Sequence, residues 1–286
     1  MVQGKWTAYP PIPGKSAPVA RNAHAQAGIK DDVWLFGGRQ GIEVGEAALA
    51  DLWKWKTKTK EWVEVKDAGG DGPPEPRSYH ACASLEDKFY VFGGCGSDGR
   101  LADLHEFNTT TNEWKRLPDP PSLAGRGGAT LEAIPDGDGD GDGSGAGTIF
   151  LFSGFEGKES RDLLTLNLAT KQWTVHPKPS LVTERSVCAS FALPGRMVVF
   201  GGEVNPSDKG HDGAGAFSKE VFAFDPMGGV SALAVKQEEG PVERWWADAA
   251  ALSDSSGFIY GGLTGSDADP KRLGDAWVLF IDEVDT

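Results

Sequence analysis

The stretch Trp34-Leu35-Phe36-Gly37-Gly38, a short hydrophobic run that ends in two glycines, recurs along the chain. The four later copies, one with serine in place of the first glycine, are Tyr90-Val91-Phe92-Gly93-Gly94, Phe150-Leu151-Phe152-Ser153-Gly154, Val198-Val199-Phe200-Gly201-Gly202 and Phe258-Ile259-Tyr260-Gly261-Gly262. From residue 37 to 93, 153, 201 and 261, the steps are 56, 60, 48 and 60 residues. A repeat of roughly 50 residues made of strand-like units predicts a β-propeller, in which each repeat folds into one blade.

The rest of each repeat agrees with this interpretation, because turn signals divide it into four short strands. We therefore predict an all-β, five-bladed propeller that forms one domain over residues 1–286. The double glycine resembles that of Kelch repeats. Each blade opens with an arginine before its first apolar strand, and an acidic residue begins its third strand. The arginines are Arg21, Arg77, Arg126, Arg185 and Arg244, and the acidic residues are Asp51, Asp103, Asp162, Glu220 and Asp275.

The two ends of the chain complement each other. The fifth repeat stops after its third strand, around residues 276–281, while residues 4–9, Gly-Lys-Trp-Thr-Ala-Tyr, match a fourth strand with its tryptophan. We expect this N-terminal strand to complete the last blade, because closing the ring removes an exposed sheet edge.

Composition narrows the range of partners. The 28 lysines and arginines against 42 aspartates and glutamates give a net charge of −14, which argues against nucleic acids and anionic membranes. No apolar run approaches the length of a membrane span, and the first residues lack a signal-peptide core. Three cysteines without disulfide spacing indicate a reducing compartment. The cytoplasm is the expected location, and the nucleus is an alternative.

The five arginines are expected to meet at one mouth of the propeller. Each precedes the innermost strand of its blade, at the end where the connection between the second and third strands also lies. A set of guanidinium groups at one mouth predicts a site for an anionic ligand. The alternative is structural, with each arginine bound to backbone carbonyls or to an acidic residue of the protein.

The connection that follows Gly202 is the second candidate. It places Glu203, Asp208 and His211 within nine residues on the arginine face. Two carboxylates and one imidazole suit a divalent iron centre with open positions, or a general acid and base. The alternative is an ordinary solvated loop, since polar residues fill any long connection.

Several strings resemble the Kelch domain of plant nitrile-specifier and thiocyanate-forming proteins. They are RNAHA from residue 21, RSYHA from 77, RGGATL at 126–131, RSVCAS at 185–190, FGGEVNPSDKGH at 200–211 and ERWWADAA at 243–250. The resemblance implies an iron-dependent enzyme acting on an anionic aglycone. It assigns metal binding to the motif Glu-x3-Asp-x3-His, which Glu203 and His211 match, with Ser207 at the middle position and Asp208 one residue late. It also implies sulfate binding by blade-opening arginines, best matched by Arg21 and Arg77, and an aromatic wall at Trp245. The plant domain has six blades, and this chain has five.

Two function classes follow. The first is a small-molecule enzyme of the lyase, isomerase or cyclase type, similar to nitrile specifiers. It would act at the arginine mouth on an anionic or polar substrate, with Fe(II) or with acid and base catalysis by Glu203, Asp208 and His211. The second is a Kelch interaction scaffold that binds an acidic peptide of a protein partner at the same mouth. Fold alone does not decide between them.

Overall fold

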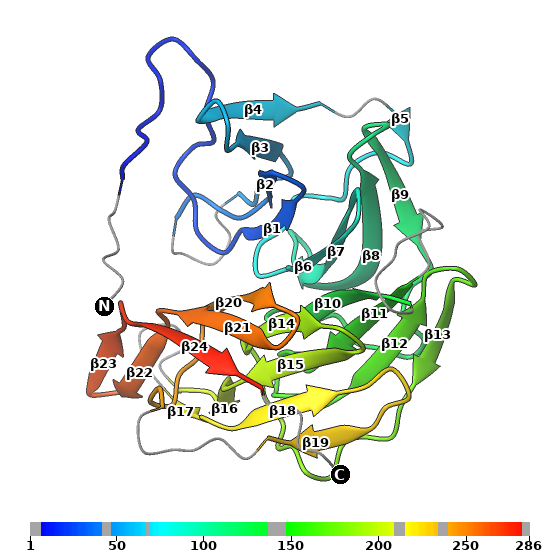
Figure 1. Cartoon of the computed structure of the whole chain (residues 1–286), viewed down its shortest axis with the longest axis vertical. Coiled ribbons are helices and arrows are strands. Elements are labelled where there is room, and N and C mark those ends of the chain that lie inside the picture. The colour runs from blue at the N-terminus through cyan, green and yellow to red at the C-terminus, as the bar shows by residue number, and fades with distance from the viewer. Residues whose placement is uncertain are drawn as a thin grey trace.

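Five small β-sheets surround a central cavity in the computed structural model, which describes residues 7–41, 47–66, 69–136, 147–208, 215–233 and 240–281 (Figure 1). The predicted all-β, five-bladed propeller is confirmed, and the described residues form no helix. None of them therefore offers a helix that could cross a membrane.

The first three blades each contain four consecutive antiparallel strands. Blade one comprises β1 (Ala25–Ile29), β2 (Asp32–Phe36), β3 (Leu52–Lys56) and β4 (Glu61–Val65). Blade two comprises β6 (Ala81–Leu85), β7 (Lys88–Cys95), β8 (Arg100–Asn108) and β9 (Glu113–Leu117), with the short parallel strand β5 (Gly69–Gly70) at its outer edge. Blade three comprises β10 (Thr130–Pro135), β11 (Gly147–Phe152), β12 (Leu163–Asn167) and β13 (Gln172–Val175).

The last two blades carry additional ribbons in the connection after the glycine pair. Blade four comprises β14 (Ala189–Leu193), β15 (Arg196–Phe200), β18 (Val221–Phe224) and β19 (Val230–Ala232), with the ribbon β16 (Glu203–Asn205) and β17 (Ala216–Phe217). Blade five comprises β20 (Asp248–Ser253), β21 (Ser256–Tyr260) and β24 (Ala276–Phe280), with the ribbon β22 (Leu263–Ser266) and β23 (Asp269–Arg272).

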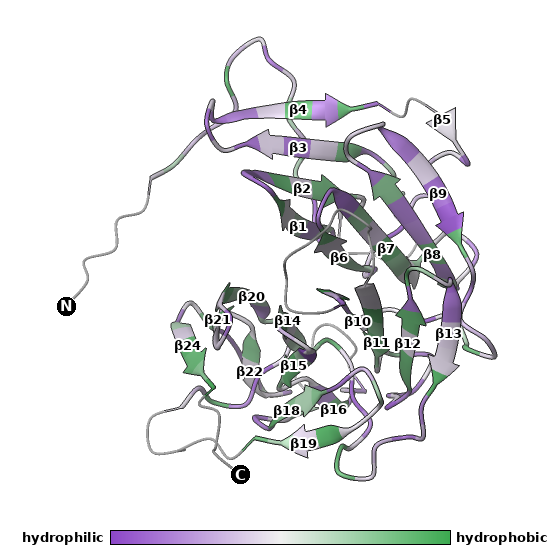
Figure 2. Cartoon of the chain, turned by 45° about the vertical axis from the view of Figure 1, so that its right-hand side comes forward, coloured by the Kyte–Doolittle hydropathy of each residue, from purple (hydrophilic) through white to green (hydrophobic). Residues whose placement is uncertain are grey.

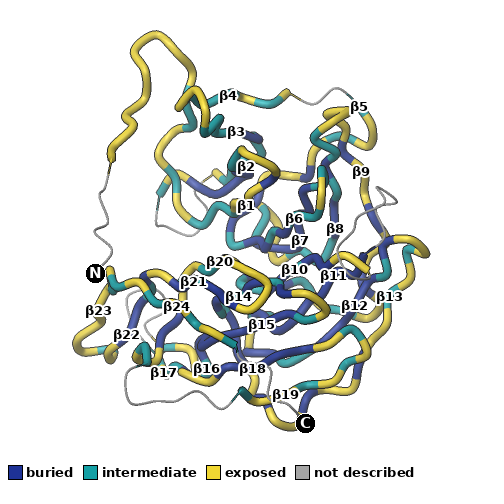
Figure 3. Tube along the Cα trace, in the orientation of Figure 1, coloured by how far each residue is buried: buried dark blue, intermediate teal, exposed yellow. Residues whose placement is uncertain are grey.

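The core lies between neighbouring blades. Alternate residues of each strand point to opposite faces of its sheet, so a blade can pack against a neighbour on either side. Within the described residues, apolar clusters join blades one and two, two and three, three and four, and four and five, and none joins blade five to blade one. The clusters between blades are apolar; between blades two and three, for example, Phe92 and Leu104 pack with Ile149 and Leu164. Figure 2 shows hydrophobic residues mainly on strands and hydrophilic ones on loops and outer strands such as β9, and Figure 3 shows β15 and β18 deeply buried.

The glycine pair is required by the backbone. Gly38 adopts φ +93°, and a Cβ there would lie 2.8 Å from the carbonyl oxygen of Asn22. A side chain would therefore separate the second strand from the segment that opens the blade. This close approach explains why the motif recurs in each repeat.

The predicted closure by residues 4–9 is not what the described residues show. Residues 4–6 lie outside the description, and residues 7–9 form no strand. Tyr9 instead packs on blade one, 5.9 Å from the ring of Trp55 and beneath the ammonium group of Lys60. Pro10 and Pro11 follow directly and lack the N–H groups that a strand ladder needs.

Blade five therefore has three described strands, and one of its faces is open. The exposed apolar side chains on this face are Leu252, Tyr260, Val278 and Phe280, with Phe280 72% exposed. The opposite face packs on blade four through Ile259.

Candidate functional site

Each blade-opening arginine is buried against a carboxylate of its own blade. The fully buried Arg77 donates to the two carboxylate oxygens of Asp103 at 2.7 and 2.8 Å, and to the carbonyl of Gly93 at 3.0 Å. It thereby ties the segment before β6 to both β7 and β8. The carbonyl bond and the two-oxygen contact recur in Arg21–Asp51 and Arg244–Asp275, whereas Arg126 and Arg185 keep the carbonyl bond and contact one oxygen of Asp162 and Glu220.

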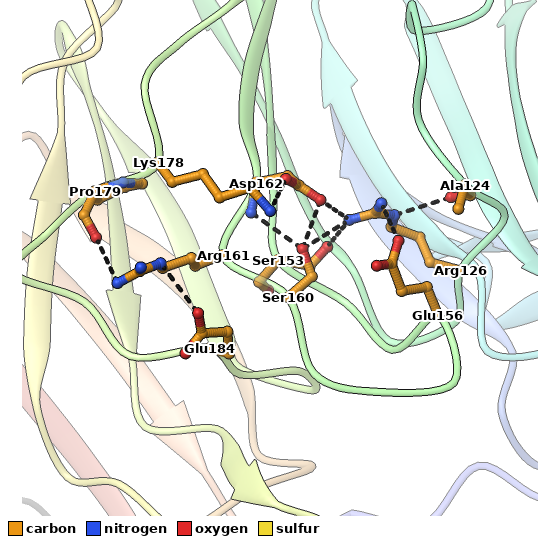
Figure 4. Close-up of polar contacts among 10 residues, drawn as sticks. All are labelled: Ala124, Arg126, Ser153, Glu156, Ser160, Arg161, Asp162, Lys178, Pro179 and Glu184. Carbon is orange, nitrogen blue, oxygen red and sulfur yellow. Dashed lines mark hydrogen bonds and ion pairs between the residues drawn. The ribbon is translucent and has the colours of Figure 1, made fainter.

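Blade three carries the most elaborate of these pairs. Figure 4 shows Arg126 between Asp162 and Glu156, at 3.0 Å from each carboxylate, with Ser160 joined to both Arg126 and Asp162. Lys178 approaches the second oxygen of Asp162 at 2.9 Å. Burial alone would raise the pKa of Asp162, but hydrogen bonds from Lys178, Ser160 and Arg126 outweigh it and lower the pKa to about 2.

This geometry supplies the structural role that was one of the two alternatives for these arginines. Within the described residues, none of the five lines the central cavity. Substrate binding by Arg21, Arg77, Arg126, Arg185 and Arg244 stays a prediction, and it would require a ligand to displace a carboxylate that is already bonded.

A chain of backbone hydrogen bonds links the blades at the mouth. The residue two positions after each arginine adopts the left-handed conformation, with φ between 47° and 62° at Ala23, Tyr79, Gly128, Val187 and Trp246. The N–H groups of the last four each donate to the carbonyl of the equivalent residue in the preceding blade, at 2.8–3.1 Å. These bonds run from Tyr79 to Ala23, from Gly128 to Tyr79, from Val187 to Gly128 and from Trp246 to Val187. Between blades five and one, the described residues make no such bond. These residues and their hydrogen bonds thus form a nearly closed circle around the mouth. Residues other than glycine with positive φ are concentrated at functional sites.

The central cavity has a volume of about 1070 Å³, and its cationic residues are Arg39 and Arg272. Arg39 occupies the position directly after Gly37-Gly38 and pairs with Asn22 in the backbone. Its guanidinium donates to the hydroxyl of Tyr79 at 2.8 Å and lies 4.9 Å from the centre of that ring. The ring of Trp246 stacks on Tyr79 from the other side of the mouth, with 6.3 Å between ring centres.

Carboxylates lie deeper in the same cavity. Glu132 of β10 accepts a hydrogen bond from the hydroxyl of Ser190 at 2.6 Å, and Asp248 of β20 accepts one from Gln26 at 3.2 Å. Burial raises the pKa of Glu132 to about 7, and the charge of Asp248 adds to this effect. The cavity therefore combines an arginine and aromatic rings at its mouth with acidic groups in its interior.

The predicted tryptophan is adjacent to the one that lines the cavity. Trp245 is buried, stacked between Phe217 at 5.8 Å and Trp246 at 4.3 Å. Trp246 lines the cavity, because its left-handed backbone turns the chain inward at this position. The sequence pattern places one tryptophan of this pair at the mouth and the other between blades, but it does not single out Arg39 or Tyr79. Aligning the repeats at the residue after the glycine pair would have singled out Arg39.

The predicted metal loop is described only in part. Glu203 is buried at the start of β16, Asp208 is exposed in a turn, and His211 lies outside the described residues. Burial raises the pKa of Glu203 to about 7, offset in part by the N–H of Ser207. Across the described ranges, no group of three or more His, Cys, Asp or Glu side chains is arranged to hold a metal ion. The iron centre stays a prediction, to which the structure contributes one buried carboxylate.

Comparison with known proteins agrees with the repeat. A family model described as the KLHDC2/KLHL20/DRC7 Kelch-repeats domain matches residues 1–137. The solved structure of YjhT superimposes with a TM-score of 0.72 at 17% identity, covering 98% of this chain and 86% of that one. The chain is a β-propeller whose residues 1–137 match a Kelch-repeat family model.

Relatives of this propeller include an enzyme and two proteins whose names state no activity. It is 27% identical over 235 residues to N-(sulfonatooxy)prop-2-enimidothioate sulfolyase of Thlaspi arvense, covering 75% of this chain and 64% of that protein. It is 31% identical over 176 residues to Kelch domain-containing protein 2 of Bos taurus, covering 59% of this chain and 40% of that protein. It is 29% identical over 242 residues to host cell factor 1 of Homo sapiens, covering 77% of this chain and 11% of that protein. The chain thus spans less than two thirds of each relative.

Proposed function

We propose that this propeller is an enzyme that binds a small anionic molecule in its central cavity. The observation that carries the proposal is the cavity of about 1070 Å³ with Arg39 at its mouth. A cavity of this size suits a small ligand, and a few polar groups on apolar walls are typical of such sites. A guanidinium beside aromatic rings favours a planar anion such as a carboxylate, or a sulfonated group.

The proposed roles follow from the geometry. Arg39 holds the anionic group, and its position is fixed by the bond to the hydroxyl of Tyr79. Tyr79 and Trp246 form the flat wall against which the rest of the ligand packs. The sulfolyase from Thlaspi arvense supports a lyase or isomerase reaction on a sulfonated substrate, and we extend that reaction class to this chain as part of the proposal.

Fe(II) is a further part of this proposal. Glu203, Asp208 and His211 would hold the ion, and as a Lewis acid it would polarise the bound substrate. Metal analysis of protein purified anaerobically without chelators tests it. Iron near one equivalent in the wild type, lost in His211→Ala, is expected; an iron-free and fully active protein would remove Fe(II) from the proposal.

The test of anion binding uses a stable oxime O-sulfonate, titrated into the full chain by calorimetry. Arg39→Met should weaken binding about 10- to 100-fold, because a charge-assisted hydrogen bond is lost. Arg100→Met is the matched control, since Arg100 is exposed and lies over Phe155 outside the cavity. Equal affinity in Arg39→Met and the wild type would contradict the site.

Catalysis is measured separately, as sulfate released from N-(sulfonatooxy)prop-2-enimidothioate, the compound in the relative's name. We expect release above the uncatalysed rate, reduced in Arg39→Met. The second function class is tested with a fluorescent acidic peptide, because peptide carboxylates offer Arg39 the same chemistry. Peptide binding without oxime sulfonate binding or sulfate release would favour an interaction scaffold.

A further inference from the structure

Glu159, in blade three, is a buried carboxylate that forms no ion pair among the described residues. Only 7% of the residue is exposed, and within the described part of the chain neither carboxylate oxygen accepts a hydrogen bond. It follows the connection after Ser153-Gly154 and immediately precedes Ser160, whose backbone pairs with Arg185 of blade four. The carboxylate therefore lies at the junction of blades three and four.

Glu203 is its neighbour across this junction. The backbone of Ser186, next to Arg185, exchanges two hydrogen bonds of 3.0 Å with Glu203, which brings Glu203 to the same junction. Only 6% of Glu203 is exposed. Burial raises the pKa of Glu159 to about 7, the charge of Glu203 adds to this, and the nearby Ser186 hydroxyl offsets it in part.

The backbone around Glu203 leaves room for nothing larger than glycine on one side. A Cβ on Gly215 would lie 2.7 Å from one carboxylate oxygen of Glu203 and 2.5 Å from the carbonyl of Asn205. Gly215 itself has φ +60°, a conformation that favours glycine. The second ribbon strand of blade four therefore packs closely around this carboxylate and holds it in place.

Two buried hydroxyls of blade three lie beside Cys188, which follows Ser186 by two residues. The hydroxyls of Ser153 and Thr130 are buried and make no hydrogen bond within the described residues. Both lie beside the thiol of Cys188. Burial raises the pKa of this thiol to about 11, the charge of Arg185 lowers it, and the charge of Glu159 raises it. Of the two glutamates, Glu203 accepts a hydrogen bond from the N–H of Ser207, whereas both oxygens of Glu159 lack a partner among the described residues.

Two buried carboxylates at one junction are costly without a counter-charge, and Asp267 adds a third negative charge near Glu203. The described ion pairs include no lysine or arginine bonded to Glu159 or Glu203, whereas each blade-opening arginine has its carboxylate. Oxygen donors in such a setting match the preference of small divalent cations. Mg²⁺ in particular binds through one or two carboxylates and keeps several waters.

We propose that Glu159 and Glu203 together bind a hard divalent cation of the Mg²⁺ or Mn²⁺ type at the junction of blades three and four. Water molecules complete the coordination. The site uses a residue of blade three that the predicted iron motif lacks, and it needs neither Asp208 nor His211. It does not depend on anion binding at Arg39. It shares Glu203 with the proposed Fe(II) site, and the variants Glu159→Gln and Asp208→Asn distinguish the two.

The test titrates Mn²⁺ into chelator-stripped full-length protein, with bound metal measured by electron paramagnetic resonance and the melting temperature recorded in parallel. The wild type should bind one Mn²⁺ per chain, and its melting temperature should rise with Mn²⁺ concentration. Glu159→Gln should bind Mn²⁺ at least about 10-fold more weakly. Without metal it should melt at or above the wild-type temperature, because an unpaired buried charge is removed.

Two further variants make the outcome decisive. Glu132→Gln is the matched control, since Glu132 is also a buried glutamate with a raised pKa but lies in the cavity and is bonded to Ser190; its Mn²⁺ affinity should equal that of the wild type. Asp208→Asn should also bind normally. The proposal is overturned if the wild type binds no Mn²⁺, or if Glu159→Gln binds it as the wild type does.

Discussion

Buried charge is handled in two opposite ways in this propeller. Within the blades, Arg77 and its four counterparts each lie against a carboxylate, with bonds of 2.6–3.0 Å. At the junction of blades three and four, Glu159 and Glu203 lie buried with no described cation beside them. The first arrangement repeats with every blade, and the second occurs at this junction.

The difference separates what holds the fold from what serves a ligand. A paired buried charge is satisfied in the folded protein itself, so the arginine pairs need no other molecule to explain them. An unpaired buried carboxylate lowers stability, and residues of that kind concentrate at functional sites. The contrast leads to predictions of opposite sign for the two sets.

The largest expected effect comes from breaking one arginine pair. Arg77→Ala leaves the carboxylate of Asp103 with only His105 as a partner and removes a bond to the carbonyl of Gly93. The free energy of unfolding should fall by about 3–5 kcal/mol, the usual cost of removing one partner of a buried ion pair. Urea unfolding at pH 7 measures it.

The control for this prediction is Arg100→Ala, which should change stability by less than about 1 kcal/mol because Arg100 is exposed. The double variant Arg77→Met with Asp103→Leu removes both charges, and it should be more stable than Arg77→Ala alone. If Arg77→Ala unfolded at the wild-type urea concentration, these pairs would not be what holds the blades.

The next effect is the pH dependence of stability, in which the two sets act in different ranges. Pairing lowers the pKa of Asp162 and Asp275 to about 2, so their contribution is present above the unfolded value near 4 and is lost as pH falls towards 2. Burial raises the pKa of Glu159 and Glu203 to about 7. Their folded state binds protons more tightly, so stability falls as pH rises from about 4.5 to 7.

Chemical unfolding of metal-free protein between pH 3 and 8 checks this prediction. Stability should be greatest near pH 4–5 and should decline by on the order of 1–3 kcal/mol towards pH 7.5. Glu159→Gln should flatten the decline without altering the acid limb. Glu132, whose pKa is also raised to about 7, keeps part of the slope in that variant. A decline of unchanged steepness would mean that Glu159 is ionised freely in the folded state.

The fold could be predicted from the sequence because one backbone requirement recurs in every repeat. Gly38 and its counterparts approach the preceding segment too closely for a side chain, so the glycine pair is visible in the sequence wherever a blade occurs. The arginine and the acidic residue were visible as well. Their bond was not, because Arg77 and Asp103 lie 26 residues apart and meet only when β7 and β8 pair.

The residues at the cavity mouth illustrate what the sequence does not carry. Trp245 and Trp246 are chemically identical neighbours, and only the left-handed turn at Trp246 decides which one lines the cavity. Glu159 lies in a short connection of ordinary composition, and its burial depends on the packing of blade four. Closure by residues 4–9 was inferred from a motif, whereas Tyr9 packs on Trp55 of blade one and stays 49% exposed.

The smallest effect concerns Ser153, a residue that belongs to both arrangements. Its carbonyl accepts a bond from Arg126 at 3.1 Å, as the first glycine of the pair does elsewhere, while its buried hydroxyl has no partner within the described residues. Its φ of +60° is unfavourable for any residue with a side chain. Ser153→Gly should therefore raise the free energy of unfolding by about 1 kcal/mol, because it relieves the backbone and keeps the arginine bond.

Ser153→Ala separates the cost of the backbone conformation from the cost of the unpartnered hydroxyl, since it removes the hydroxyl and retains the strained backbone. If Ser153→Ala stabilises as much as Ser153→Gly, the unpaired hydroxyl is the dominant cost. If Ser153→Gly alone stabilises, the cost lies in the backbone. If both destabilise in the presence of Mn²⁺ but not in its absence, the hydroxyl belongs to the cation site beside Glu159.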